Sequence, residues 1–361
     1  MITLLHSSDT DVLDKLLQTR ERGDVPLVGD DRWSDQQWNA VQELVTDATL
    51  PRTAAWASLT SGSSGAPRVV IRTDASWSDS FAVISTYLRV HAGDTVFLPA
   101  PASSSLTLYS LAHALAGGPQ PGGQDANALH GTPQSLRFVL DLSTKVTTMR
   151  TALVGGSHLD TALRSRAEAE GISVVSYYGA AELSFVAVDT GDGLRAFPGV
   201  ELDVRAGILW VRSPFVATGY LGAPGPLRTE GSWATVGDRA ELTDGVLRLR
   251  GRADNAILSA SATIVPEEVE SALRSLPGVR DAVVIALNRE RVGALVAAVI
   301  EPEDNTTVSA RTLRIAAEAI LTPSHRPRRW FCAILPRTSS GKVARAEVER
   351  LVDSGAVTAL D

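Results

Sequence analysis

The chain has 361 residues, of which 44% are hydrophobic and 21% charged, and its formal net charge is −7. This composition is typical of a soluble globular protein, and the length favours two domains over one. The acidic balance, without any basic run, excludes a nucleic acid or an anionic membrane held by bulk electrostatics, while a local nucleotide site stays possible.

Cysteine content and apolar runs bear on the location of the protein. Cys332 is the only cysteine, so no disulfide can form within the chain, and we expect a cytoplasmic location. Apolar stretches such as Leu295–Ile300 are too short to span a bilayer, and the first residues lack the features of a secretion signal. Cys332 lies in the apolar run Trp330–Leu335, which predicts a buried strand residue rather than a nucleophile.

The first half of the chain changes pattern near residue 54. The first 50 residues predict amphipathic helices over Asp11–Thr19 and Asp35–Leu44, without a catalytic pattern. From Ala54 onward, short apolar runs alternate with helix-length segments, which predicts an α/β domain with a largely parallel sheet. The expected strands are Ala54–Leu59, Thr95–Pro99, Thr151–Val154 and Ser173–Tyr177, and the expected helices are Ser76–Leu88, Leu106–Leu115 and Leu159–Glu170. Gly117–Thr132, rich in Gly, Pro, Asn and Gln, is expected to be a mobile surface loop.

The second half predicts a β-rich region and then a compact α+β unit. The β-rich strands are expected at Val200–Arg205, Ile208–Arg212 and Val246–Arg250. The last third predicts helix, strand, strand, helix and strand at Pro266–Ser275, Ala282–Leu287, Gly293–Ile300, Ala310–Leu321 and Trp330–Ile334. We therefore expect an α/β fold with a large N-terminal domain at residues 1–253, which holds a parallel-rich sheet and a β-rich subdomain. A small α+β C-terminal domain would follow at residues 254–361.

Thr60–Arg68 is a Ser/Gly-rich segment that follows an expected strand. Gly62 and Gly65 permit close approach of the backbone to a ligand, and Arg68 adds a cation. Its hydroxyl groups can wrap phosphate oxygens: Thr60, Ser61, Ser63 and Ser64. The spacing is not that of a Walker loop. Taken alone, the segment favours a surface loop without a ligand.

Glu182 follows an expected strand that ends in Tyr177-Tyr178-Gly179, itself preceded by Gly155-Gly156 and a helix. A carboxylate just past a strand end lies at the crevice where open α/β sheets bind ligands, and it can hold Mg²⁺. A solvated loop glutamate explains the residue equally well.

Two further segments carry an aspartate and a lysine suited to nucleotide chemistry. Asp238 ends Thr235-Val236-Gly237-Asp238 and can accept hydrogen bonds from ribose hydroxyls, although turn aspartates are common. Lys342 lies in the Gly-containing segment Leu335–Arg345. It is either a solvated surface charge or a mobile cation that reaches a reacting phosphate.

In order and spacing, these segments resemble the core motifs of the superfamily of acyl-CoA synthetases, nonribosomal peptide adenylation domains and firefly luciferase. Gly207–Tyr220 and Gly251–Glu270 also match, and the resemblance runs from about Thr60 to Arg345. It implies ATP-dependent activation of a small carboxylic acid to an acyl-AMP with release of pyrophosphate. The acyl group would then pass to a thiol, with ATP, Mg²⁺ and coenzyme A as the cofactors. A carrier protein or an amine is the alternative acceptor, and a non-catalytic nucleotide-binding homologue is a third alternative.

The resemblance also implies a role for each matching residue. Thr60 to Arg68 would form the phosphate loop, and Lys342 would bridge the acid and the α-phosphate in the adenylation transition state. Glu182 would hold Mg²⁺, and Asp254 would be the hinge between the domains. The remaining nucleotide-binding positions would be Gly155, Gly156, Tyr178 and Gly179 around the adenine, and Asp238 and Arg252 at the ribose.

The chain departs from the pattern of this superfamily in length and at several positions. It is shorter than most members, lacks part of the usual N-terminal region, and is similar in length to compact actinobacterial o-succinylbenzoate-CoA ligases. Ala102 stands where a His is common, Ala181 where Thr or Ser precedes the Glu, and Arg68 where Lys is common. In the hinge region, Leu258 and Ser261 replace a frequent Lys and Gly, which makes thioester formation a weaker expectation than adenylation.

Overall fold

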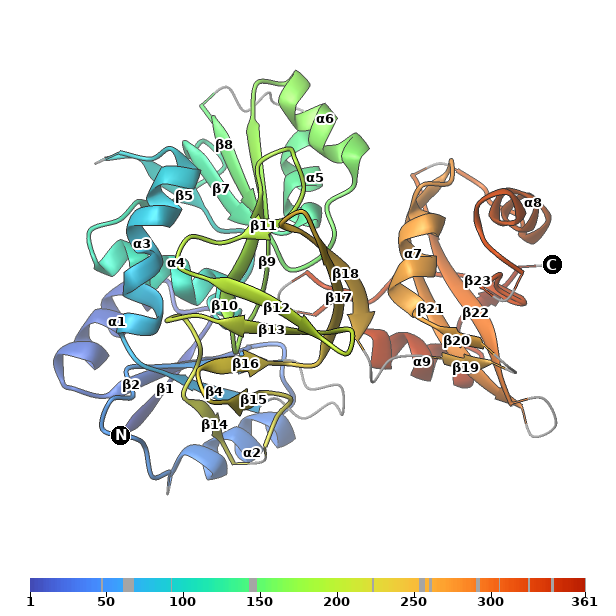
Figure 1. Ribbon diagram of the computed structural model, residues 1–361. Coiled ribbons are helices and arrows are strands. Elements are labelled where there is room, and N and C mark those ends of the chain that lie inside the picture. Colours follow the sequence, from blue (N-terminus) through green and yellow to red (C-terminus); the bar gives the residue numbers. More distant parts are fainter. Residues whose placement is uncertain are drawn as a thin grey trace.

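The computed structural model describes residues 1–46, 48–60, 68–91, 93–142, 148–222, 224–252, 257–259, 262–289, 293–304, 306–323, 325–338 and 341–360. Figure 1 shows a larger body that ends with β18 and a smaller body that begins with β19. The predicted domain boundary at residues 253 and 254 lies outside the described residues, so it stays a prediction.

The N-terminal segment contributes a mixed sheet in the order β1-β2-β3-β4-β14. Its strands are β1 (Ile2–His6), β2 (Val25–Gly29), β3 (Trp56–Thr60), β4 (Arg68–Arg72) and β14 (Gly219–Leu221). Helices α1 (Val12–Glu21) and α2 (Asp35–Thr46) match the two predicted amphipathic helices. Strands β1 and β2 were not predicted. All five residues of β2 are buried, so the polar–apolar alternation of a half-exposed strand is missing there.

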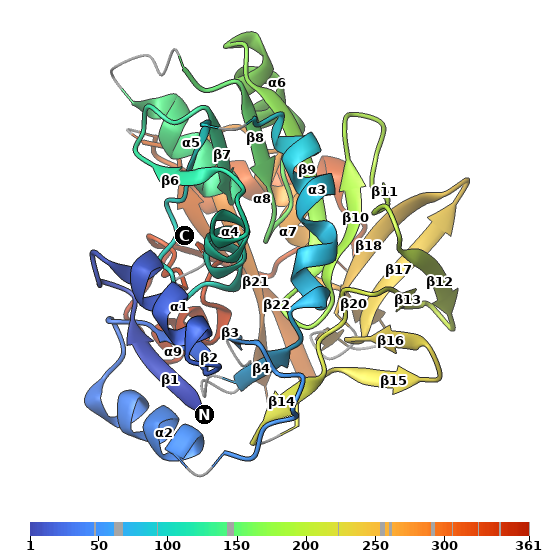
Figure 2. The same cartoon turned by 90° about the vertical axis from the view of Figure 1, so that its left-hand side faces the viewer.

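A second sheet, in the order β11-β10-β9-β8-β7-β5-β6, forms the upper part of the larger body in Figure 2. Strands β9, β8, β7, β5 and β6 run parallel to one another, which confirms the predicted parallel-rich sheet, and β10 is antiparallel to β9. The strands are β5 (Thr95–Phe97), β6 (Gln120–Gly122), β7 (Ala128–Gly131), β8 (Thr151–Val154), β9 (Ser173–Ala180), β10 (Ser184–Asp189) and β11 (Arg195–Ala196). The helices between them are α3 (Ala75–Leu88), α4 (Ser105–Leu115), α5 (Pro133–Asp141) and α6 (Thr161–Ala169).

The prediction of a mobile surface loop at Gly117–Thr132 is wrong. The segment contains β6 and β7, and all four residues of β7 are buried between β5 and β8. Its polar side chains have partners inside the protein: Asn127 Oδ1 accepts from the Thr95 N–H at 3.0 Å, and His130 bonds Ser110 and Tyr177. Polar composition suggested exposure here, but buried polar groups are common when they are hydrogen-bonded.

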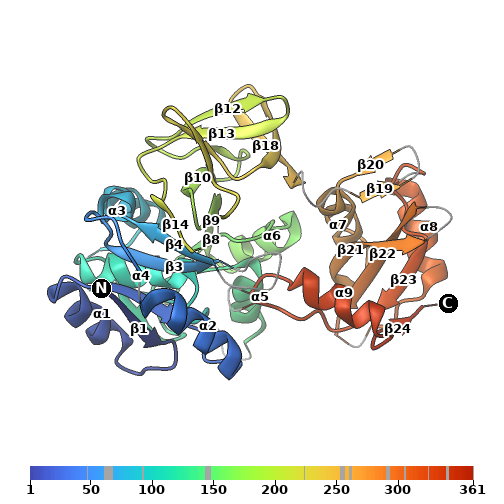
Figure 3. The same cartoon turned by 90° about the horizontal axis from the view of Figure 1, so that it is seen from below.

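The predicted β-rich region is an antiparallel sheet in the order β15-β16-β13-β17-β18, with β12 paired to β13. Its strands are β12 (Glu201–Arg205), β13 (Ile208–Arg212), β15 (Arg228–Glu230), β16 (Trp233–Thr235), β17 (Asp238–Thr243) and β18 (Val246–Arg252). Figure 3 shows this sheet on one side of the larger body, with the smaller body beyond the end of β18.

The smaller body has an α+β fold around the sheet β21-β22-β23-β24, with its own buried apolar core. Its elements are β19 (Ile257–Ser259), β20 (Ala262–Ile264), α7 (Pro266–Arg274), β21 (Val279–Arg289), β22 (Gly293–Pro302), α8 (Ala310–Ile320), β23 (Arg329–Cys332), α9 (Arg345–Asp353) and β24 (Thr358–Ala359). The predicted order of elements is confirmed for α7, β21, β22, α8 and β23, and the strands β19, β20 and β24 and the helix α9 come in addition. In Figure 3, α9 lies on the side of the smaller body that faces the larger one. Within the described ranges, the structure has no helix with the length and apolar character needed to cross a membrane.

Candidate active site

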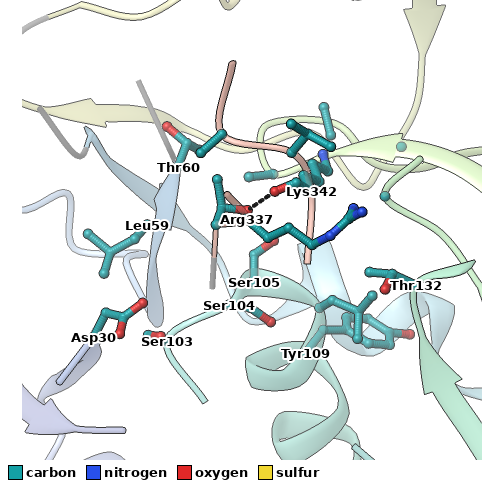
Figure 4. Close-up of a pocket in the computed structure, with 18 of the residues that line it drawn as sticks. Asp30, Leu59, Thr60, Ser103, Ser104, Ser105, Tyr109, Thr132, Arg337 and Lys342 are labelled. Carbon is teal, nitrogen blue, oxygen red and sulfur yellow. Dashed lines mark hydrogen bonds between the residues drawn. The ribbon is translucent and has the colours of Figure 1, made fainter. Parts of the chain in front are cut away.

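A cavity of about 1010 Å³ lies between the two bodies, at the ends of β3, β7 and β9. Its polar lining comes from segments far apart in the sequence, as Figure 4 shows: Thr60 at the end of β3, Ser103, Ser104 and Ser105 before and at the start of α4, Thr132 after β7, and Arg337 and Lys342 from the smaller body. Ser104 is brought to this place by a parallel bridge to Leu59. Because both bodies contribute, the cavity depends on how they dock.

Lys342 reaches into the part of the cavity formed by the larger body. A β-carbon built at Gly156, just after β8, would lie 3.4 Å from Lys342 Cε, and one built at Gly341 would lie 3.0 Å from Thr132 Oγ1. Both glycines have positive φ, +87° and +79°, which favours glycine. The lysine loop is closed by hydrogen bonds from Thr338 N to Lys342 O at 2.7 Å and from Gly341 N to Thr338 O at 2.9 Å. The structure therefore brings together Lys342 and Gly156, two of the predicted site residues.

Glu182 lies in the turn between β9 and β10 and is only 6% exposed, which rules out the alternative of a solvated loop glutamate. Its Oε1 accepts a hydrogen bond from the Tyr220 hydroxyl at 2.8 Å, and its carbonyl oxygen accepts one from Ala217 N at 2.7 Å. Burial and the Glu182 charge both raise the pKa of Tyr220, and the Arg68 charge lowers it.

Glu182 fits a site for Mg²⁺ in its chemistry, because a hard cation prefers carboxylate oxygens. Among the residues that the structure describes, no group of three His, Cys, Asp or Glu side chains could hold a metal ion. An ion at Glu182 would therefore complete its coordination with water and ligand oxygens, as Mg²⁺ commonly does beside phosphates.

Tyr178 and Asp238 are also brought together, although they are 60 positions apart. The Tyr178 hydroxyl donates a hydrogen bond to Asp238 Oδ2. Asp238 begins β17 and is paired in register with Arg252 at the end of β18, so the two predicted ribose residues are cross-strand neighbours. Neither Tyr178 nor Asp238 belongs to the cavity lining itself.

Two of the predicted glycines have packing roles in the structure. A β-carbon at Gly155 would lie 2.2 Å from Tyr177 Cζ, and one at Gly179 would lie 2.0 Å from the Ser184 carbonyl oxygen. Glycine is therefore required at both positions by the ring of Tyr177 and by the β9–β10 turn. Ser61, Gly62, Ser63, Ser64, Gly65 and Asp254, together with the Arg252 side chain, lie outside the described residues.

Several cavity residues were missed by the sequence analysis. Asp30, Arg32, Trp33 and Gln37 line the cavity, although the first 50 residues showed no catalytic pattern. Asp30 follows β2, and the carboxyl ends of parallel strands are where such sites form, so a correct prediction of β2 would have pointed to it. Arg72 at the end of β4 was also missed.

The described lining residues carry more positive than negative charge, in contrast to the net charge of −7 for the whole chain. The basic side chains are Arg32, Arg72, Arg337, Lys342, Arg345 and Arg350, and the acidic ones are Asp30, Glu347 and Glu349. Arg337 and Arg345 form ion pairs with carboxylates outside the lining, and the remaining surplus of basic side chains suits anionic ligands such as nucleotides and carboxylates.

Residues 268–342 match the AMP-binding enzyme C-terminal domain family. The chain is also 24% identical to the putative long chain fatty acid-CoA ligase VraA of Staphylococcus epidermidis, over 93% of this chain and 84% of that protein. It is 28% identical to the uncharacterized acyl-CoA ligase YhfT of Bacillus subtilis, over 81% of this chain and 68% of the relative. These matches support the superfamily of adenylate-forming enzymes that the sequence resembles.

Solved structures of adenylate-forming enzymes have the same fold. A variant of E. coli MenE with bound OSB-AMS superposes with a TM-score of 0.84 at 22% identity, covering 97% of this chain and 87% of that one. ATP-bound MatB from Rhodopseudomonas palustris superposes with a TM-score of 0.81 at 19% identity, covering 97% of this chain and 88% of that one. The predicted architecture of a large N-terminal and a small C-terminal part is thereby confirmed.

Proposed function

We propose that this protein activates a carboxylic acid with ATP and transfers the acyl group to a thiol, which we take to be coenzyme A. In the first step a carboxylate oxygen attacks the α-phosphorus, the bond from that phosphorus to the bridging oxygen breaks, and pyrophosphate leaves. In the second step a thiolate attacks the acyl carbon and AMP leaves with the former carboxylate oxygen. The observation that carries this proposal is the position of Lys342, which extends from the smaller body into the cavity that both bodies line, with its Cε close to Gly156 of the larger body.

The chemistry explains why such a cation is needed. A carboxylate is a poor electrophile because its leaving group would be oxide, so activation must create a better leaving group. Acid and triphosphate are both anionic, and Lys342 at the cavity offsets their repulsion as charge builds up at the α-phosphate. When bound at Glu182, Mg²⁺ would neutralise phosphate charge and orient the leaving pyrophosphate.

The other predicted site residues belong to this proposal in the roles that the superfamily resemblance implies. The Ser/Gly segment from Thr60 to Arg68 would hold phosphate oxygens, and Asp254 would be the hinge. The nucleoside would be held by Gly155, Gly156, Tyr178, Gly179, Asp238 and Arg252. The hydrogen bond from Tyr178 to Asp238 supports a shared role for these two side chains, because it orients the carboxylate proposed for the ribose.

The acceptor and the acid need separate support. Relatives named as CoA ligases favour coenzyme A. Similarity to the fatty acid–[acyl-carrier-protein] ligase MmaC of Mycobacterium marinum, 28% identical over 80% of this chain and 66% of that protein, makes a carrier-protein thiol the second candidate. A cytoplasmic location stays our prediction from the single cysteine, Cys332, whose thiol pKa is raised by burial.

ATP–pyrophosphate exchange tests the proposal directly. A panel of short, medium and long aliphatic acids and of aromatic acids would be screened for exchange, and each active acid would then be tested for thioester formation with coenzyme A. We expect exchange with at least one acid class and consumption of coenzyme A with the same acid. Exchange without thioester would favour a carrier protein or amine as acceptor. No exchange with any acid would favour a nucleotide-binding homologue without catalysis.

A further inference from the structure

Arg72 has the largest of the fully buried side chains in the described part of the chain, and it also lines the cavity. It is the last residue of β4, with a relative exposure of 0%. Nε and Nη2 both donate to the Ala181 carbonyl, Nε at 3.1 Å. Nη1 donates to the Phe215 carbonyl at 2.8 Å and to Ser76 Oγ at 3.3 Å. One guanidinium therefore ties together three segments of the larger body.

The positive charge of Arg72 is held by carbonyl oxygens rather than by an ion pair. Among the described residues, no carboxylate lies within 4.0 Å of its guanidinium. Burial lowers the pKa of Arg72 to about 9, against the raising effect of the Glu182 charge, so the side chain is still protonated at neutral pH. Its Cζ also lies 5.6 Å from the centroid of the Trp77 ring. Keeping an unpaired charge buried is costly, which suggests that this cation serves the site.

The segments that Arg72 connects are those that position Glu182. Ala181, whose carbonyl accepts two of its hydrogen bonds, directly precedes Glu182. The segment after Phe215 holds the other side of Glu182, through the hydrogen bond from Ala217 N to the Glu182 carbonyl. Because the Ala181 methyl group cannot hydrogen-bond, the orientation of this turn depends on its main chain, and Arg72 fixes that main chain.

We propose that Arg72 is a positioning residue for the adenylation step: it fixes the peptide that carries Glu182 and supplies a buried positive charge beneath the anion-binding cavity. It acts through Glu182 on the binding of Mg²⁺ and ATP. The proposal concerns a residue that the superfamily motifs do not assign, and it extends the function proposed above.

The test compares Arg72→Ala and Arg72→Lys with Arg164→Ala in the full-length protein. Arg164 is a matched control, because its guanidinium also donates to main-chain carbonyls, of Val174 at 2.7 Å and of Asp189 at 3.4 Å, but it does not line the cavity. Calorimetric titration with ATP and Mg²⁺ in the absence of acid gives a readout independent of turnover. Pyrophosphate exchange over a range of Mg·ATP concentrations and thermal melting complete the comparison.

We expect Arg72→Ala to weaken binding of Mg·ATP and to lower exchange by about 100-fold, on the order of the loss of one preorganised charged contact. Arg72→Lys keeps the charge but loses the forked geometry, so we expect a smaller loss of about 10-fold. Because the side chain lines a cavity, methylguanidinium at tens of millimolar should restore part of the exchange by Arg72→Ala. Arg164→Ala should lower the melting temperature but keep exchange per folded molecule within about twofold of the wild type.

The proposal is overturned if both alanine variants lose exchange only in proportion to their loss of folded protein and methylguanidinium restores neither. If Arg72→Ala does not fold, Arg72→Lys decides, and an unchanged dependence on Mg·ATP in that variant would also overturn it. A wild-type protein without exchange would contradict the proposed function instead. The role of Arg72 is then judged by the calorimetric titration, where equal Mg·ATP affinity in wild type and Arg72→Lys counts against it.

Discussion

Replacing Lys342 with alanine removes the cation that the smaller body places beside Gly156. Two unit charges 4 Å apart interact by about 4 kcal/mol at an effective dielectric constant of about 20, the value typical of a protein surface site. Loss of one preorganised contact to a developing charge costs about 2.7–4 kcal/mol in other enzymes. Both figures predict that Lys342→Ala slows acyl-AMP formation by about two to three orders of magnitude.

The two half-reactions, measured separately, show whether this loss is specific. Pyrophosphate exchange reports adenylation, and thioester formation from supplied acyl-AMP reports the second step. We expect the second step to change by less than about fivefold, because no phosphorus–oxygen bond forms or breaks in it. Lys15→Ala is the control, since Lys15 pairs with Asp9 and Asp11 and does not line the cavity. It should leave both steps unchanged.

Equal losses in both half-reactions of a folded Lys342→Ala protein would refute the assignment and make Lys342 a structural residue. A loss in exchange of less than about threefold would refute the electrostatic reasoning as well, since the missing charge would then be worth less than 1 kcal/mol.

Three further predictions concern the proposed ribose-binding residue, the proposed Mg²⁺ site and a buried histidine. Asp238→Ala should weaken ATP binding by about 1–3 kcal/mol, because ribose hydroxyls lose their acceptor, and unchanged affinity in a nucleotide titration would exclude the ribose role. Tyr220→Phe removes the hydrogen bond on Glu182 Oε1, so the Mg²⁺ concentration for half-maximal exchange should rise by about tenfold, and a normal Mg²⁺ dependence would contradict the proposed metal role. Burial lowers the pKa of His130 to about 3, below its unfolded value of about 6.5. The unfolded chain therefore binds the proton first as the pH falls below about 6.5, and stability should decrease by about 1.4 kcal/mol per pH unit down to about pH 3. His130→Gln should remove this part of the slope in denaturant titrations, and an identical slope would show that His130 is not the titrating group.

Much of the fold could be predicted where apolar residues recur with a regular period. The bounds predicted for β8, Thr151–Val154, are those observed, and the ends of α3, α4 and α6 differ from prediction by at most two residues. The pattern is missing where a strand is buried on both faces or where the buried side chains are polar. β2 has no exposed face to produce alternation, and β7 contains His130, whose polar ring is buried because Ser110 and Tyr177 satisfy both of its nitrogens.

Site residues could be predicted only where the residue and its sequence neighbours together form a recognisable motif. Lys342 and Glu182 stand in segments with a recognisable order. The structure places Lys342 in the cavity lining and buries Glu182 directly after Ala181, which lines the cavity. Arg72 gave no such signal, because its carbonyl partners at Ala181 and Phe215 lie 109 and 143 positions away. The packing reason for Gly155, the ring of Tyr177, is likewise visible only in three dimensions.

The close packing of Gly341 against Thr132 couples the position of the Lys342 segment to the larger body. Docking of the segment that carries Lys342 through this contact is a conformational equilibrium. A change of about 1.4 kcal/mol in the free energy of docking alters the docked-to-undocked ratio tenfold. If thioester formation requires the loop to leave, a substitution at Thr132 that strengthens docking slows release of the loop while it favours adenylation. Selection can therefore set the balance between accumulation of acyl-AMP and its consumption through the contact between Thr132 and Gly341.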